Sequence, residues 1–151
     1  MTRVVLDTNV LINADRGEYS YPKRILDLIL NGSVMAVMTK PVRRENQLLV
    51  ERLVRDTRLK DDIMDFLIMA ELAQPAVIKV KIDDAEDIKL LAAAVGGKAE
   101  WLITEDRHLL DLEKYQAVEI VTPQAWWQWW QAQDNQTANT WQSWTKNLFK
   151  T

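Results

Sequence analysis

The chain has 151 residues, of which 48% are hydrophobic and 27% are charged, and its formal net charge at pH 7 is −3. The absence of cysteine excludes disulfides, zinc–thiolate sites and a thiol nucleophile, and it fits a reducing cytosol. The acidic balance argues against bulk electrostatic binding to nucleic acid, although it is compatible with a local basic patch. No apolar run approaches the ~18 residues of a membrane helix, and the N-terminal apolar stretch is too short for a signal peptide. We therefore expect a soluble, cytoplasmic protein.

Short apolar segments alternate with helical patterns along the chain. Buried strands are predicted at residues 3–7, 33–39, 76–81, 100–104 and 118–121. The spacing of apolar residues predicts a short helical turn at 8–15 and helices at 21–32, 40–56, 60–73 and 83–97, with a last helix from residue 122. Strands separated by helices indicate an α/β fold, with a central, mostly parallel sheet of about five strands covered on both faces. In such folds ligands gather at the carboxyl ends of the strands.

The composition changes near residue 133. Six of the seven tryptophans lie between residues 126 and 144, and the sequence beyond 133 is rich in Gln, Asn and Thr. Two sets of apolar residues recur at helical spacing: Trp126, Trp129 and Trp130, then Trp141, Trp144 and Leu148. We divide the chain into a domain over residues 1–133 and a polar, tryptophan-containing tail over 134–151. Packing is the usual role of such tryptophans, with base stacking as an alternative, and the tail can fold back, dimerise or receive a partner segment.

Four carboxylates are predicted at the edges of buried surface. Asp7 ends the first strand, Asp106 follows the fourth, Glu45 flanks the apolar stripe of its helix, and Asp87 lies in the first turn of another. Carboxylates that gather repel one another, so a cluster needs protons or cations. Oxygen ligands suit Mg²⁺ or Mn²⁺, which also accept phosphate oxygens. A divalent ion can lower the pKa of a water and stabilise charge on a phosphate, so the pattern favours metal-assisted phosphodiester hydrolysis.

Each acid taken alone also has a structural interpretation. Asp87 can complete a capping box with Asp84, Glu45 can be a solvated helix residue, and Asp106 can be the N-cap of a short helix. Asp7 is harder to explain without a site, because a charge that ends a buried strand needs a partner. The combination of the four acids carries the functional interpretation.

Three segments of the chain carry a resemblance to a known protein family: "VVLDTNVLINA", the helix that contains Glu45, and "DDAEDIKLLAAAVGGKAEWLITEDRHLL". Over about residues 3–130 the chain resembles the PIN-domain ribonucleases, and in particular the toxins of prokaryotic toxin–antitoxin pairs. The resemblance implies a PIN-like three-layer α/β/α fold and a Mg²⁺- or Mn²⁺-dependent endoribonuclease that cleaves single-stranded RNA. The metal-binding and catalytic residues that it implies are Asp7, Glu45, Asp87 and Asp106, with Glu51 as the alternative to Glu45. The polar residues that it implies as their supports are Thr8, Asn9 and Thr104.

The sequence departs from the family pattern at His108, where the family commonly has a second acid two residues after the Asp106 position. Three interpretations stay open. The imidazole can face solvent, it can contact a substrate phosphate or relay a proton, or the change can weaken a second metal site.

Basic residues near the acids would draw a phosphate backbone toward an otherwise repulsive site. The candidate substrate-binding residues are Arg43, Arg44, Arg107 and His108. Others are more typical of solvated helix faces: Lys40, Arg52, Arg55, Arg58 and Lys60.

The resemblance also implies an antitoxin protein as a partner, and we expect the chain to form a homodimer. The alternative function is a catalytically weak PIN-fold module that binds RNA or a protein partner without cutting, which His108 and the tail would favour. A phosphatase or phosphate-receiver domain also has acids at strand ends, but "DTN" lacks the Asp-x-Asp start of the first. A phosphate-receiver domain would need paired acids at or before the first strand and a lysine after the last strand, and the sequence has neither. A Rossmann fold is disfavoured because no Gly-rich loop follows "RVVLD".

Overall fold

The computed structural model describes the backbone of residues 1–148 and, from residue 134 onward, the side chains of Thr145, Lys146 and Leu148 only. A six-stranded sheet lies at its centre, in the order β3-β2-β1-β4-β6-β5. Its strands are β1 (Arg3–Leu6), β2 (Met35–Met38), β3 (Glu71–Leu72), β4 (Trp101–Ile103), β5 (Lys114–Tyr115) and β6 (Val118–Val121). Neighbouring strands are parallel except for the β5–β6 pair. The predicted α/β class with a mostly parallel sheet is confirmed.

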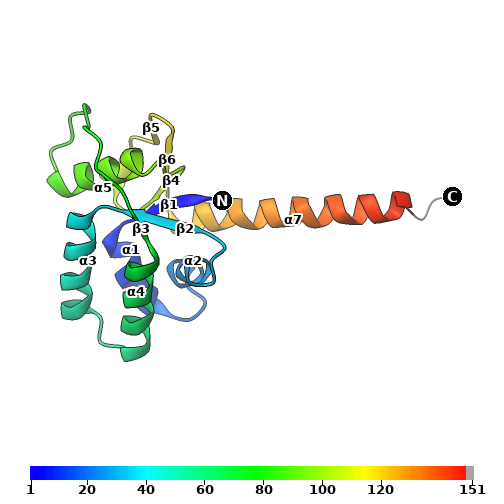
Figure 1. The fold of residues 1–151 in the computed structure, drawn as a ribbon, viewed down its shortest axis with the longest axis horizontal. Helices are drawn as coiled ribbons and strands as arrows, with labels where there is room; N and C mark the ends of the chain where they lie inside the picture. The colour runs from blue at the N-terminus through cyan, green and yellow to red at the C-terminus, as the bar shows by residue number, and fades with distance from the viewer. Residues whose placement is uncertain (149–151) are drawn as a thin grey trace.

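Helices cover both faces of the sheet (Figure 1). They are α1 (Thr8–Asn13), followed by the 3₁₀ turn η1 (Ala14–Arg16), α2 (Tyr21–Leu30), α3 (Lys40–Leu53), α4 (Thr57–Met69), α5 (Ala85–Gly96), α6 (Arg107–Leu110) and α7 (Pro123–Leu148). Successive strand residues point to opposite faces. Val4 and Leu6 therefore join a core with α1–α4 and the first turns of α7, whereas Val5 joins a second core with α5 and α6.

The boundary between α3 and α4 differs from the prediction, which ran one helix to residue 56 and began the next at residue 60. Asp56 is the N-cap of α4, where its carboxylate accepts the backbone N–H of Leu59 at 3.0 Å. An N-cap residue has extended rather than helical backbone. The preceding helix therefore ends at Leu53, and the next begins at Thr57.

The predicted strand at residues 76–81 is wrong, because the strand that pairs with β2 is Glu71–Leu72. Residues 76–81 lie outside the sheet, and the backbone N–H of Ala76 donates to the carbonyl of Ala92 in α5 at 3.0 Å. Ile78 and Val80 pack partly buried against the second core, whereas Lys79 between them is exposed and Val77 before them is 82% exposed. This alternation, which resembles that of a strand, comes from packing against a helix and not from pairing in a sheet.

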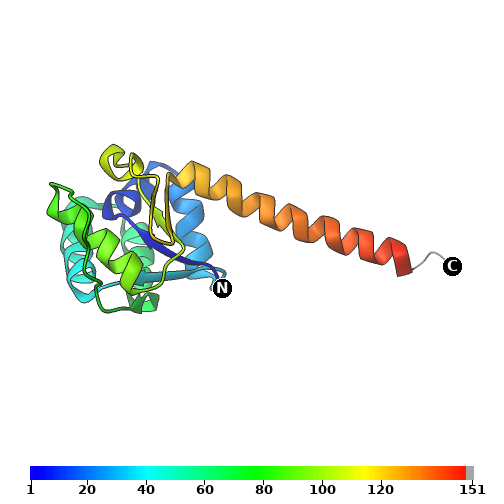
Figure 2. The same ribbon diagram turned by 90° about the horizontal axis from the view of Figure 1, so that it is seen from above.

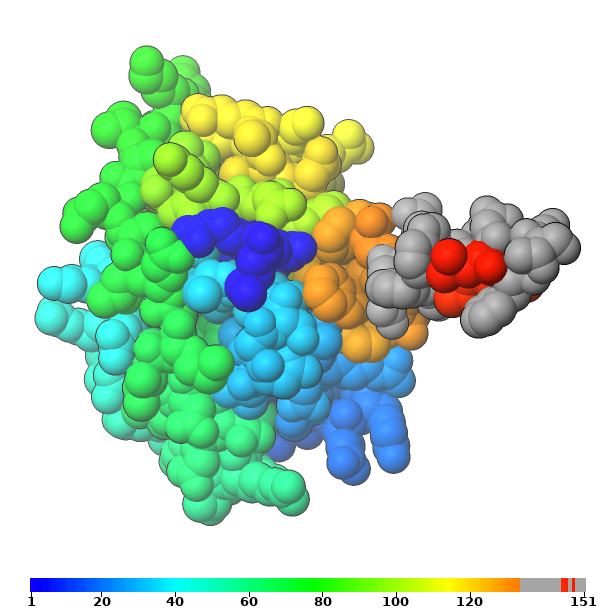
Figure 3. Space-filling model, turned by 45° about the vertical axis from the view of Figure 1, so that its right-hand side comes forward, coloured from blue at the N-terminus to red at the C-terminus, as the bar shows by residue number. Residues whose placement is uncertain are grey.

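Helix α7 begins against the domain and then extends well beyond it (Figures 1 and 2). Trp126 is fully buried, and the Trp129 ring lies 4.7 Å from that of Trp101 in β4. The first turns of α7, orange in Figure 3, lie beside α2 and the N-terminal residues. The predicted packing of these tryptophans is confirmed. The proposed division at residue 133 falls within one continuous helix, and the side chains of Trp141 and Trp144 lie outside the described residues.

Among the residues that the structure describes, no helix combines the length and apolar character that would be needed to cross a membrane.

Candidate metal centre

Two aspartates meet because the strands that carry them are neighbours. β1 and β4 pair in parallel, with Leu6 opposite Ile103, and the backbone N–H of Asp7 donates to the Ile103 carbonyl at 3.0 Å. Asp7 then caps α1 and Asp106 caps α6. Parallel pairing therefore brings both carboxylates to the same edge of the sheet, as the sequence predicted for acids at strand ends.

Thr104 connects these two aspartates and is fully buried. Its hydroxyl donates to Oδ2 of Asp7 at 2.7 Å and accepts the backbone N–H of Asp106 at 3.0 Å. The other carboxylate oxygen of Asp7 accepts the backbone N–H of Asn9 at 3.2 Å. The orientation of the Asp7 carboxylate is thus held from both sides, by the side chain of Thr104 and the backbone of Asn9, whereas the third expected support, Thr8, bonds to Asn46 instead.

Asp87, in the first turn of α5, gathers with Asp106 and Asp84, whereas Asp7 is not part of this group of three. Asp87 is only 3% exposed, and its Oδ2 is buried without a hydrogen-bond partner among the described residues. One carboxylate oxygen each from Asp84, Asp87 and Asp106 lie within 4.8 Å of one another. Asp84, which the sequence suggested only as a capping partner, also caps α5 by accepting the backbone N–H of Glu86 at 2.9 Å. Its signal was the acidic run "DDAED", whose members could not be ranked without the fold.

The electrostatics of this cluster favour a cation. Burial, the nearby charges of Asp106, Asp84 and Asp7, and a side-chain hydrogen bond with Asp106 together raise the pKa of Asp87 to about 6, with burial the largest cause. Burial also raises the pKa of Asp7, against the lowering effect of the Thr104 hydrogen bond. A divalent ion would offset this repulsion and would give the buried Oδ2 of Asp87 a partner. Donors that are all oxygen fit Mg²⁺ or Mn²⁺, so the residues present suit the predicted ion.

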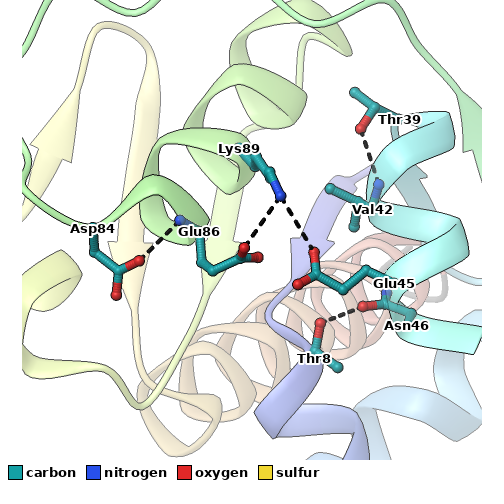
Figure 4. Close-up of polar contacts among 8 residues, drawn as sticks. All are labelled: Thr8, Thr39, Val42, Glu45, Asn46, Asp84, Glu86 and Lys89. Atoms are coloured by element: carbon teal, nitrogen blue, oxygen red, sulfur yellow. Dashed lines mark hydrogen bonds and ion pairs between the residues drawn. The ribbon is translucent and has the colours of Figure 1, made fainter. Parts of the chain in front are cut away.

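Glu45 is not in the group of Asp84, Asp87 and Asp106, and it lines, together with Asp7, a hollow of about 120 Å³. The residues that line the hollow are Asp7, Thr8, Asn9, Val42, Glu45, Leu49, Glu86, Lys89 and Leu90. Glu45 shares a hydrogen bond with Glu86, which raises the pKa of Glu45 and lowers that of Glu86. Lys89 lies between the two carboxylates (Figure 4). The alternative acid on this helix, Glu51, is exposed and does not line the hollow.

Asn46 is a buried polar residue beside the hollow that sequence reasoning missed. It is 1% exposed, its Oδ1 accepts a short hydrogen bond from the Thr8 hydroxyl, and its Nδ2 has no partner among the described residues. The signal was present in the sequence, because Asn46 lies midway between Val42 and Val50 on the buried stripe of α3. A polar residue in the middle of an apolar stripe needs a partner, and here that partner is Thr8.

The predicted substrate-binding residues lie in different places. Arg44 lines a groove of about 480 Å³ beside Glu45, whereas Arg43 is half-buried and does not line it. Arg107 and His108 are exposed on α6, and Nδ1 of His108 is 3.9 Å from Oδ1 of Asp106. We call the groove beside Glu45 the basic groove, and its lining residues are Lys40, Pro41, Arg44, Glu45, Leu48, Leu49, Arg52 and Lys89.

Comparison with known proteins agrees with this geometry. A family model described as a PIN domain matches residues 3–108, a span that includes all four predicted acids. Among solved structures, the chain is similar to one from the "Crystal structure of VapBC2 from Rickettsia felis bound to a DNA fragment from their promoter", with a TM-score of 0.52 and 14% sequence identity. The alignment covers 79% of this chain and 97% of that chain. This likeness shows a shared fold. No curated protein matches the chain.

Proposed function

Because this chain belongs to the PIN-domain family, we propose that it is a Mg²⁺- or Mn²⁺-dependent endoribonuclease that cleaves single-stranded RNA. The observation that carries the proposal is the buried, unpaired Oδ2 of Asp87 within a cluster of aspartates. An unpaired buried carboxylate oxygen is costly, and a cation supplied from solution removes that cost. A purely structural capping role for Asp87 would leave the unpaired oxygen unexplained.

Asp7, Asp87 and Asp106 would hold the ion, with Asp84 within reach. When bound, a divalent ion lowers the pKa of a water and offsets the charge that develops on the phosphate. Thr104 and Asn9 fix the orientation of Asp7, in the way that hydrogen-bond partners orient metal ligands generally. Water is the proposed nucleophile, so no side chain needs to form a covalent intermediate.

The basic groove is the proposed path of the RNA backbone. Glu45, Leu49 and Lys89 line both this groove and the hollow beside Asp7, so the two spaces adjoin. Its cationic residues would neutralise phosphates next to the acidic centre: Lys40, Arg44, Arg52 and Lys89. Arg107 and His108 would contact the strand on the other side of Asp106, where both are exposed. The acidic chain would thus bind RNA through a local patch rather than through net charge.

We propose further that the protein is the toxin of a toxin–antitoxin pair and acts in the cytoplasm on cellular RNA. The similarity to a chain of VapBC2 supports this assignment at the level of fold. A homodimer is proposed as well. Apolar side chains exposed near the end of α4 would be covered in it: Ile68, Met69 and Leu72. Light scattering coupled to size-exclusion chromatography tests the dimer, and co-purification with the product of an adjacent gene tests the antitoxin.

The central test is cleavage of a fluorescent single-stranded RNA with Mg²⁺ or Mn²⁺ and with a chelator. We expect chelator-sensitive cleavage by the wild-type protein, and none by Asp7→Asn or Asp87→Asn. Asp65→Asn, at an exposed position on α4, is the matched control and should cleave like the wild type. RNA binding without chelator-sensitive cleavage would instead establish the alternative, a PIN-fold binding module. Equal cleavage by Asp7→Asn would disprove the metal mechanism.

A further inference from the structure

Lys89 places a positive charge at the edge of the candidate metal centre. Its Nζ lies 3.1 Å from Oε1 of Glu86 and 4.0 Å from Oε2 of Glu45 (Figure 4). Glu86 is one turn away on α5, whereas Glu45 comes from α3. The lysine therefore links two helices across the wall of the hollow that Asp7 lines on the other side.

The acids around the hollow form two groups with different charge balance. The aspartate group, Asp84, Asp87 and Asp106 with Asp7 beside them, contains no cationic side chain in the ion pairs of the described residues apart from the contact of exposed His108 with Asp106. The glutamate group, Glu45 and Glu86, holds the ammonium of Lys89 between its members. Only the aspartate group thus lacks a built-in counter-charge.

Nucleases that use two divalent ions place them about 3.5–4 Å apart, one on each side of the reacting phosphate. The glutamate group brings Glu45 from α3 and Glu86 from α5 to the hollow that Asp7 also lines, so a second ion would find its ligands there. The ammonium of Lys89 already contacts both of its carboxylates. A divalent ion would have to displace that ammonium. An ion that bound beside the ammonium would be repelled by its positive charge.

We propose that Lys89 takes the place of a second divalent ion, so that the protein binds one metal ion, at the aspartate group. Lys89 is in this view a positioning residue that keeps the Glu45 carboxylate on its own side of the hollow. The inference deepens the proposed function, and it rests on the aspartate group binding a divalent ion. Lys89 also lines the basic groove, so its charge lies where the phosphate of a bound strand would arrive.

The test is the stoichiometry of Mn²⁺ binding to the full chain without RNA, measured by isothermal titration calorimetry. The wild type should bind one ion per chain. Lys89→Met, which keeps the length of the stem and removes the charge, should bind two. Lys89→Arg, which keeps the charge, should bind one. Lys81→Met is the matched control, because Lys81 is exposed and lines neither space, and it should also bind one.

A second variant identifies where the extra ion binds. Adding Glu45→Gln to Lys89→Met should return the stoichiometry from two to one, and circular dichroism verifies that each variant is folded. Two ions in the wild type, or one ion in folded Lys89→Met, would overturn the inference. No ion in the wild type would overturn it together with the metal centre. One ion in the wild type and two in Lys89→Met, without RNA cleavage by either, would uphold the inference and refute only the proposed nuclease.

Discussion

The hydroxyl of Thr104 donates to Oδ2 of Asp7 at 2.7 Å, which joins the residue after β4 to the residue after β1. The hydroxyl oxygen of Thr104 also accepts the backbone N–H of Asp106 at 3.0 Å. One fully buried side chain therefore sets the orientation of one candidate ligand and the backbone position of another. The relationship depends on the register of the sheet, because Leu6 lies opposite Ile103 immediately before the two polar residues.

Replacing Thr104 with Val keeps the shape and removes both hydrogen bonds. We expect Mn²⁺ affinity to fall about 10–100-fold, as for other residues that orient metal ligands. The free energy of unfolding should fall by about 1–3 kcal/mol, because a buried carboxylate oxygen loses its donor. Calorimetric titration and urea unfolding measure the two effects. Thr104→Ser retains the hydroxyl and should keep most of the affinity, so equal losses in both variants would contradict the assigned role.

The raised pKa of Asp87 predicts how stability depends on pH. The folded protein binds this proton more tightly than the unfolded chain, because the pKa is about 6 in place of 3.8. The stabilising contribution is therefore complete below the unfolded value and is lost as the pH rises through about 6. Without metal, the thermal midpoint should fall over this range, and in Asp87→Asn that part of the fall should disappear.

Metal binding should show the opposite pH dependence, because ligand carboxylates must be ionised. We expect excess Mn²⁺ to raise the thermal midpoint more at about pH 7.5 than at about pH 5, since protons compete for Asp87 at the lower pH. Differential scanning fluorimetry at the two pH values measures the difference. An equal increase at both would show that Asp87 does not hold the ion.

Substitutions in the basic groove should weaken RNA binding without changing metal binding. Arg44→Ala and Arg52→Ala each remove a cation from the groove wall. Each should lower the slope of log affinity against log salt by about 0.7 if it contacts one phosphate of a single strand. Fluorescence anisotropy at several salt concentrations measures that slope. Arg55→Ala, which does not line the groove, is the control, and an equal effect there would point to general charge instead.

The two parts of α7 should contribute differently to stability. Trp126 is fully buried among the first core, so Trp126→Ala should lower the free energy of unfolding by about 3–5 kcal/mol. Removal of residues 134–151 keeps Trp126, Trp127, Trp129 and Trp130, which pack in or against the first core, and should change the free energy of unfolding far less. Urea unfolding of both variants measures the contrast. A comparable loss on truncation would show that the tail is part of the folded domain rather than a separate unit.

Local sequence patterns determined much of this protein. An apolar run followed by an acid predicts a buried strand with that acid at the edge of the sheet. Asp7 directly follows β1 and Asp106 lies shortly after β4, and both strands are largely buried. Asp87 in the first turn of an apolar helix was found in the same way. Such features depend on neighbours within a few residues, and so they are readable from one chain.

The tertiary structure decided what depends on residues distant in sequence. The alternation at 76–81 fits a strand, but the segment packs along α5, and only the assembled fold shows that Glu71–Leu72 pairs with β2. The pairing of Glu45 with Lys89 joins residues 44 positions apart on two helices. The relative position of α3 and α5 is set by packing on the sheet and not by local propensity. The sequence therefore predicted Asp7, Glu45, Asp87 and Asp106, whereas the fold placed Asp84 beside Asp87 and Asp106 and paired Glu45 with Glu86 and Lys89.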